Sequence, residues 1–228
     1  MFELSPQELG ILALSLRVAL ASVVCSLPIA IVVAHCLARL SFPGKTLVDA
    51  MIHLPLVLPP VVVGFALLVL FGKRGPIGSL LDQWFGIVFA FRWTGAALAS
   101  AIMGFPLMVR AIRLSIEAID RRLEVAARTL GASRPWVFAS ITLPLALPGI
   151  ITGTLLSFAR GLGEFGATIT FVSNIPGETQ TLALAIYGLT QTPGGDAHAM
   201  RLIWLSLAVS VAALLVSEAL ARRIERRR

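Results

Sequence analysis

Long apolar runs separated by short polar stretches dominate the hydrophobic pattern of the chain. A helix that crosses the hydrocarbon core of a bilayer needs about 20 apolar residues, and somewhat shorter runs can cross within a bundle. Five runs meet this requirement, and they occupy residues 11–38, 51–71, 94–109, 136–159 and 202–221. The pattern therefore predicts an all-α polytopic membrane protein with about five transmembrane helices in a single domain over residues 1–228.

A sixth apolar stretch, residues 165–177, is too short and too rich in turn-forming residues for a straight crossing. It fits a re-entrant or interfacial segment better than a span. A sixth crossing at this place is the alternative topology. The first apolar run follows two glutamates and no Lys or Arg, so it is expected to be a retained span rather than a cleaved secretory signal.

The starts of the second and fourth apolar runs resemble each other. "IHLPLVLP" (residues 52–59) and "ITLPLALP" (residues 141–148) agree at six of eight positions. Each proline bends its helix, and prolines four residues apart, such as Pro55 and Pro59 or Pro144 and Pro148, are expected to share one helix face. Corresponding proline-interrupted segments indicate the path of a transporter, although two bent apolar helices can also converge on similar sequence. The candidate path residues from these segments are Pro55, Pro59, Pro60 and Pro148.

Composition narrows the class further. Of the 228 residues, 57% are hydrophobic and 14% are charged, and the mean hydropathy is +0.89, whereas soluble domains carry about 25% charged residues. So few charged residues cannot cover the water-exposed surface of a soluble domain. The net charge of +7 would suit nucleic acid, but the basic residues cluster beside the apolar runs. That placement is typical of membrane orientation and argues against nucleic-acid binding.

The distribution of Lys and Arg predicts the orientation, because basic residues near the ends of spans gather on the cytoplasmic side. Thirteen of them fall on one side: after the first run, between the third and fourth runs, and in the C-terminal "RRIERRR". Five fall on the other side. The N-terminus is therefore expected outside the cytoplasm and the C-terminus inside it.

No motif for catalysis, metal binding or nucleotide binding is found in the sequence. The Gly-Lys-Thr of "FPGKT" (residues 42–46) lacks the first glycine of a phosphate-binding loop, because Arg39 stands in that position. The two cysteines lack metal-binding spacing, and His35 and His53 are expected to pack or cap helices. The chain is therefore predicted not to be an enzyme and to hold no metal or cofactor. Any ATPase that powers it must be a different polypeptide.

Two ionisable residues lie at the outer end of the fourth run, in "FARGLGEFGATITF" (residues 158–171). Arg160 and Glu164 are four residues apart and can pair on one helix face. Ionisable groups at membrane depth are functional candidates, and a guanidinium suits the geometry of an oxyanion. Both residues are therefore candidates for an anion path. A structural ion pair is the alternative, and it is favoured for Glu164.

The polar stretch "EVAARTLGASRPWVFASITLPLALPGI" (residues 124–150) carries the most specific pattern. Residues 123–130 have a helical, alanine-rich pattern, and Gly131 permits a left-handed turn. Ser133 can cap a following helix that has Pro135 in its first turn. This predicts a short helix on the cytoplasmic face and a sharp turn into the fourth span. A basic amphipathic helix resting on anionic lipid would explain the arginines but not the spacing of Gly and Pro.

The same stretch resembles the cytoplasmic signature of importer-type ABC permeases, E-A-A-x3-G-x9-I-x-L-P. Gly131 takes the glycine position and Ile141 follows after nine residues. Val125 stands in place of the glutamate, with Glu124 one residue earlier. The resemblance implies that the loop over about residues 113–140 couples the permease to an ATPase. The implied coupling residues are Glu124, Ala126, Ala127, Arg128, Gly131, Ile141, Leu143 and Pro144.

Longer stretches, among them "HLPLVLPPVVVGFALLVLFGKRGPIG" and "RGLGEFGATITFVSNIPGETQT", resemble the molybdate permeases of that family. The resemblance implies a homodimer that imports molybdate across the bacterial cytoplasmic membrane. Two copies of an ATPase that binds ATP and Mg²⁺ would power it, and a periplasmic or lipid-anchored binding protein would supply the oxyanion. Sulfate, thiosulfate and tungstate are alternative substrates. A secondary anion transporter is a more distant alternative, because the second, third and fourth runs contain no coupling carboxylate.

Overall fold

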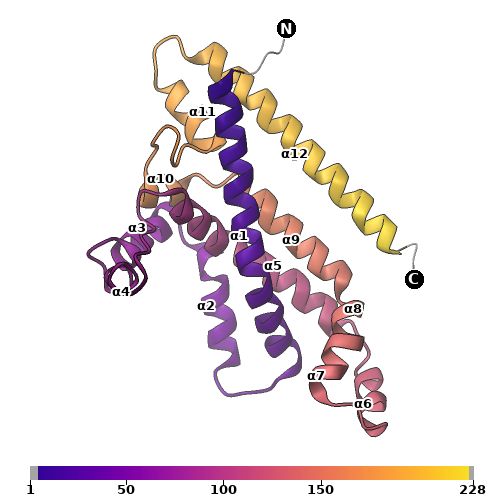
Figure 1. Ribbon diagram of the computed structural model, residues 1–228. Coiled ribbons are helices and arrows are strands. Elements are labelled where there is room, and N and C mark those ends of the chain that lie inside the picture. The colour runs from indigo at the N-terminus through magenta and orange to yellow at the C-terminus, as the bar shows by residue number, and fades with distance from the viewer. Residues whose placement is uncertain (1–4, 226–228) are drawn as a thin grey trace.

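Two long helices, α1 (Pro6–Arg39) and α5 (Trp93–Glu117), pack against each other and form the frame of the molecule (Figure 1). The computed structural model describes residues 5–225, apart from some side chains beyond residue 213. Within this part of the chain every regular element is helical. Of the described helices, α1 and α5 are each long and apolar enough to cross a membrane alone, which agrees with the first and third predicted spans.

Both helices bury many small side chains. Those of α1 include Ala19, Ser22, Ala30 and Ala34, and those of α5 include Ala96, Ala99, Ser100 and Gly104. Small residues let helix backbones approach closely, which strengthens van der Waals packing where lipid provides no hydrophobic drive for association. A capping box fixes the first turn of α1, because the side chains of Ser5 and Glu8 each accept the other residue's backbone N–H.

The second and fourth predicted spans are each broken into two helical parts. α2 (Lys45–Val57) and α3 (Pro60–Phe71) meet at an angle of 112°. The first part of the fourth span consists of α7 (Arg134–Val137), the π-helical turn η1 (Phe138–Thr142) and α8 (Leu143–Leu145). This part meets α9 (Leu147–Leu162) at an angle of 67°. Each pair is therefore a candidate span only when its two parts are taken together.

The prolines account for the different sizes of the two bends. A proline cannot donate a helical hydrogen bond, and it disfavours the helical conformation of the residue before it. Leu58 and Pro59 both precede a proline, and both are extended, with ψ angles of 143° and 132°. At the second bend Pro144 and Pro148 lie two residues before and two residues after Ala146, and Leu147, which precedes Pro148, keeps its place in the helix. Two consecutive prolines thus break the helix more completely than two separated ones.

The prediction that the prolines of each stretch share a helix face is wrong. Pro55 lies inside α2, whereas Pro59 lies beyond its end and precedes α3. Pro144 lies in α8 and Pro148 in the first turn of α9, on either side of the bend. The break between the two members of each pair ends the helical periodicity on which that prediction relied.

Two short helices follow the fourth span, α10 (Gly166–Val172) and α11 (Leu182–Thr190). At 1.5 Å per residue they rise roughly 10 Å and 14 Å, which is too little to cross a bilayer. α10 packs against α3 and α5 and carries the fully buried Phe171. The structure therefore agrees with a re-entrant or interfacial segment at residues 165–177, and it has no sixth crossing there.

The remaining described helices are α4 (Pro76–Phe85), α6 (Arg121–Thr129) and α12 (Asp196–Glu225). α12 contains the fifth predicted span and contacts α9 and α11 before it diverges from the other helices (Figure 1). Three of the arginines counted for the orientation, Arg226, Arg227 and Arg228, lie outside the described residues.

Glycines allow α9 to lie directly against α5. A Cβ added to Gly149 would lie 2.2 Å from the Cβ of Ser115 and 2.7 Å from the carbonyl oxygen of Ala111. A Cβ added to Gly153 would lie 2.9 Å from the carbonyl oxygen of Met108. These neighbours are mostly backbone atoms, which cannot yield without a shift of the whole helix. The close contact between α5 and α9 therefore depends on the absence of side chains at these two positions.

We expect Gly149→Ala to destabilise the protein, because the added methyl group has no room against α5 and overpacking of this kind costs about 1–3 kcal/mol. The measurement is the midpoint of thermal unfolding of the purified protein in detergent. Gly10→Ala is the matched control, because nothing lies within 4 Å of a Cβ at Gly10 in α1. An equal midpoint for the two variants would contradict the close contact between α5 and α9.

Candidate functional site

The predicted coupling stretch forms a short helix and a tight turn at one end of the bundle (Figure 1). α6 begins after Asp120, whose carboxylate accepts the backbone N–H of Arg122 at 2.9 Å. The chain turns after α6 at Gly131, where φ is +89°, which confirms the predicted left-handed turn. Ser133 precedes α7 as predicted, with Pro135 in the first turn, but the Ser133 side chain makes no capping hydrogen bond.

Glu124 holds α6 to two other elements. Its Oε1 accepts one hydrogen bond from Nε of Arg39 and one from the hydroxyl of Thr142, both at 3.0 Å. Arg39 ends α1 and Thr142 ends η1, so one carboxylate joins α6 to the first span and to the start of the fourth. The side chains of Arg39 and Glu124 are 8% and 17% exposed, so the protein largely shields this ion pair from water.

The carboxylate of Glu124 therefore has its partners within this chain. Val125, which stands in the position of the family's glutamate, is 58% exposed. A shift of one residue along an α-helix turns a side chain by about 100° around the axis. Moving the glutamate from position 125 to 124 thus moves it from the outer face of α6 to the inner face. The resemblance implied a coupling role for Glu124, and the structure shows that its carboxylate bonds to Arg39 and Thr142 of the same chain.

The other residues of the signature divide between two segments. On α6, Ala126 and Arg128 are exposed and Ala127 is half-buried. The signature residues after the turn are Ile141 in η1 and Leu143 and Pro144 in α8. The signature therefore extends from α6 through the π-helical turn η1 into α8. Turns of the π type are frequent at functional sites.

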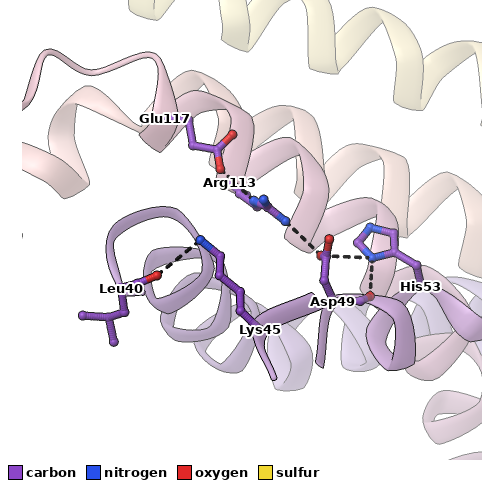
Figure 2. A network of polar contacts seen from close by, with 6 residues as sticks. All are labelled: Leu40, Lys45, Asp49, His53, Arg113 and Glu117. Carbon is purple, nitrogen blue, oxygen red and sulfur yellow. Dashed lines mark hydrogen bonds and ion pairs between the residues drawn. The ribbon is translucent and has the colours of Figure 1, made fainter. Parts of the chain in front are cut away.

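A second polar network, which the sequence analysis missed, joins α2 to α5 (Figure 2). Arg113 of α5 donates from Nη1 to Oδ1 of Asp49 in α2 at 2.9 Å. It also donates from Nε to Oε1 of Glu117 at 2.8 Å. Nδ1 of His53 lies 2.8 Å from the backbone carbonyl oxygen of Asp49. The network holds the start of α2 against the last turns of α5.

Parts of this network were visible as pairs four residues apart, Asp49 with His53 and Arg113 with Glu117. Nothing in the sequence indicates that the two pairs meet across helices. The prediction that the histidines pack or cap helices is confirmed for His53 and also for His35, whose ring lies edge-on to an aromatic ring. Among the described side chains, no group of His, Cys, Asp and Glu has the arrangement of a metal site.

Arg160 and Glu164, the candidate ionisable residues of the fourth run, form the predicted pair. Nη1 of Arg160 lies 2.6 Å from Oε2 of Glu164, whose side chain is 1% exposed. The other oxygen of Glu164 accepts the backbone N–H of Ala167 at 2.8 Å, in the first turn of α10. Glu164 thus fixes the start of α10, whereas Arg160 is 27% exposed and uses one of its several donors for the pair.

The candidate prolines lie in different surroundings. Pro60 begins α3 and meets the start of α10, where a Cβ added to Gly166 would lie 2.7 Å from the Cβ of Pro60. Pro55 lines an apolar cavity of about 510 Å³ between α1, α2 and α5. Pro59 lies in the break before α3, and Pro148 lies in the first turn of α9. The structure therefore joins Pro60 to the helix that Glu164 caps and gives Pro55 a separate environment.

The fold agrees with that of solved ABC transporters. A bacterial alginate transporter, solved with an alginate-bound periplasmic protein, matches 96% of this chain and 80% of its own, with a TM-score of 0.77 and 19% identity. The MetNI methionine transporter in an inward-facing conformation matches 95% of this chain and 94% of its own, with a TM-score of 0.67 and 14% identity. At these identities the likeness concerns the fold alone.

The sequence agrees with permeases of known systems. The molybdenum transport system permease proteins ModB of Escherichia coli K12 and Haemophilus influenzae are 61% and 57% identical to it, and each match covers 96% of both chains. The sulfate permease CysT of Salmonella typhimurium is 37% identical over 80% of this chain and 66% of its own. Residues 26–228 match the family described as the binding-protein-dependent transport system inner membrane component. The chain therefore belongs to this family of multi-pass ABC importer permeases.

Proposed function

We propose that this chain is the membrane-spanning subunit of an ATP-driven importer that carries molybdate across the bacterial cytoplasmic membrane. The observation that carries the proposal is the 61% identity to the Escherichia coli molybdenum permease over 96% of both chains. The identity to the sulfate permease is 37% over a shorter match, so sulfate is the weaker candidate. Tungstate, a tetrahedral dianion like molybdate, is the closer alternative substrate.

The proposed importer contains a second copy of this chain and two further kinds of subunit. A second copy of this chain completes the pore, and two copies of a cytoplasmic ATPase bind ATP and Mg²⁺. A periplasmic or lipid-anchored protein delivers the oxyanion, in keeping with the family's dependence on binding proteins. The permease chain holds no cofactor of its own in this proposal.

The end of the bundle that carries α6, which we call the coupling end, offers a route by which an ATPase can move the spans. An ATPase that closes on ATP pushes α6, which lies at the end of the bundle. Because Glu124 bonds to both Arg39 and Thr142, the push reaches α1 and η1 together. From η1 the chain passes through the bend at Ala146 into α9, so α9 is the span that such a push would rock.

The proposed anion path runs beside α3, α9 and α10. Arg160 of α9 retains donors beyond its pair with Glu164, and a guanidinium can present several N–H groups to one oxyanion. The pair also limits the positive charge at this point, which favours release, since a transported ion must bind weakly enough to leave. Pro60 and Gly166 hold α3 close to α10 beside the same pair.

Transport provides the direct test of the proposed function. We expect the chain, expressed with its ATPase and binding protein in a strain that lacks molybdate uptake, to restore the uptake of labelled molybdate. Unlabelled tungstate should compete strongly and sulfate weakly. Restored sulfate uptake with no molybdate uptake would reject the proposed substrate.

Gly131 tests the coupling role of α6. We expect Gly131→Val to reach the membrane at normal levels but to lose substrate uptake and the stimulation of ATP hydrolysis by loaded binding protein. A side chain with a Cβ costs roughly 1–2 kcal/mol in the left-handed conformation, and more when it is β-branched. Nothing lies within 4 Å of a Cβ at Gly131, so the effect comes from the backbone and not from a clash.

Gly131→Ala serves as the graded control and should retain more uptake than Gly131→Val, because its side chain is smaller and unbranched. Normal uptake by Gly131→Val at an unchanged protein level would contradict the coupling role. It would favour a helix that merely rests on anionic lipid.

A substitution of Glu124 tests the contacts by which α6 is held to α1 and η1. We expect Glu124→Ala to lower the free energy of unfolding by about 2 kcal/mol, since it leaves the shielded guanidinium of Arg39 without its counter-charge. Val125→Ala, next to it but 58% exposed, should change the free energy by less than about 0.5 kcal/mol. Chemical denaturation in detergent measures both values, and a reversed order would show that Glu124 faces outward.

The charge distribution generates a prediction for orientation. We expect green fluorescent protein fused to the C-terminus to fluoresce, because that end is proposed to lie in the cytoplasm. A periplasmic alkaline phosphatase fused to the N-terminus, with the first span retained, should be active. Inactive phosphatase together with fluorescent C-terminal fusions would require an even number of crossings and would reject the proposed topology.

A further inference from the structure

A basic cavity of about 330 Å³ lies between the end of α1, α6 and the segment from α7 to η1. Its arginines come from the three helices α1, α6 and α7, and they are Arg39, Arg121, Arg128 and Arg134. Glu124 is the one carboxylate among the residues that line it. The cavity is therefore a place where positive charge exceeds negative charge.

Hydrogen bonds and ion pairs leave most of this positive charge unbalanced. Glu124 is paired with Arg39, and Arg121 donates from Nη2 to the backbone carbonyl of Ala38 at 3.2 Å, which carries no counter-charge. With the described side chains, Arg128 and Arg134 form neither an ion pair nor a hydrogen bond. An occupant that completes this cavity must bring negative charge.

The length of α5 places the cavity outside the hydrocarbon core. Trp93, at the start of α5, stacks with Arg17, whose Cζ lies 3.8 Å from the ring centre, and tryptophan favours the membrane interface. Arg113 follows 20 residues later along the helix. Those residues rise roughly 30 Å, which is the thickness of the hydrocarbon core. α6 begins beyond Arg113, so an occupant reaches the cavity from the aqueous side.

We propose that a carboxylate side chain of the ATPase subunit enters this cavity and pairs with Arg128 and Arg134 when α6 docks. This inference rests on the proposed function and adds the chemistry by which the partner is held. A guanidinium binds a carboxylate through two parallel hydrogen bonds, which fixes orientation as well as distance. Two free guanidinium groups beside one cavity provide a site for one or two such carboxylates.

Apolar surface next to the cavity supports a protein partner. Val125 and Leu130 are 58% and 89% exposed on and just after α6, in a segment that lies beyond the hydrocarbon core. Protein interfaces combine an apolar core with charged groups that steer the encounter and fix the register. The arginines of the cavity and these two side chains together have that composition.

Co-purification gives the first arm of the test. Tagged permease is purified in neutral detergent with its ATPase, which mass spectrometry identifies in the wild-type complex, and the complex is washed at increasing salt. We expect the double variant Arg128→Gln, Arg134→Gln to weaken ATPase binding about thirtyfold, a typical loss when a charge pair at an interface is broken. Arg122→Gln is the matched control, because Arg122 is an exposed arginine of α6 that does not line the cavity.

Zero-length coupling gives the second arm, because carbodiimide links an amine to a carboxylate only when the two are in contact. Arg128→Lys and Arg134→Lys each bring an amine to the cavity and keep the charge. We expect both variants to couple to an Asp or Glu of the ATPase, which peptide mapping then identifies. Arg122→Lys should not couple to the same carboxylate.

The outcomes separate this inference from the proposed function. If no ATPase co-purifies with the wild-type permease, the proposed function itself fails. If the ATPase binds but neither lysine variant couples to it, and the double variant binds as tightly as Arg122→Gln, the proposed carboxylate contact is rejected. Loss of ATPase binding that is restored by added anionic lipid would also reject it, and would assign the cavity to a lipid headgroup.

Discussion

The ion pair between Glu124 and Arg39, extended by the hydroxyl of Thr142, is the contact on which the geometry of the coupling end depends. It joins residues that are 85 and 18 positions apart in sequence. Removing one partner of a shielded ion pair is costly, because the other charge stays behind without compensation. The pair therefore fixes the rotation of α6 about its axis. With that rotation fixed, Val125 and Arg128 remain exposed on the outer face of α6.

The rest of the molecule divides into a closely packed frame and broken segments. Small residues bring α1, α5 and α9 into close contact, so these helices form a stiff unit. The extended residues Leu58 and Pro59 and the short helix α10 interrupt regular backbone beside α5. Irregular backbone at membrane depth is tolerated only where protein covers it or where it lines a watery space. The breaks therefore suit the proposed path through the permease.

The sequence predicted the features that depend on local pattern. Continuous apolar runs anticipated α1 and α5, and the spacing around Gly131 anticipated the left-handed turn, because glycine adopts that backbone conformation more readily than any other residue type. The pairing of Arg160 with Glu164 was also predictable, since both lie on one helix turn. The contact of the Arg160–Glu164 pair with the start of α10, however, follows from the tertiary fold. The residues of the proposed coupling and path sites were thus recognisable, but their roles there stay predictions.

Contacts between distant segments could not be predicted in this way. The link between Asp49 and Arg113 crosses 64 positions, and no local pattern marks it. The inward direction of Glu124 depends on where α1 ends, which the sequence of α6 does not contain. The shared face of the prolines failed for a related reason. The prediction assumed an unbroken helix, whereas two successive prolines end the helix at Leu58.

The π-helical turn η1 has a consequence for the angular phase of the fourth span. A π-turn accommodates one more residue than the α-helical turn it replaces, and one residue of an α-helix corresponds to about 100° of rotation. If Phe138–Thr142 became α-helical with every residue kept, the extra residue would add about 100° of rotation. The helix before η1 would then turn relative to α9. The membrane would still accept such a chain, but Thr142 and Glu124 could no longer both keep their present faces.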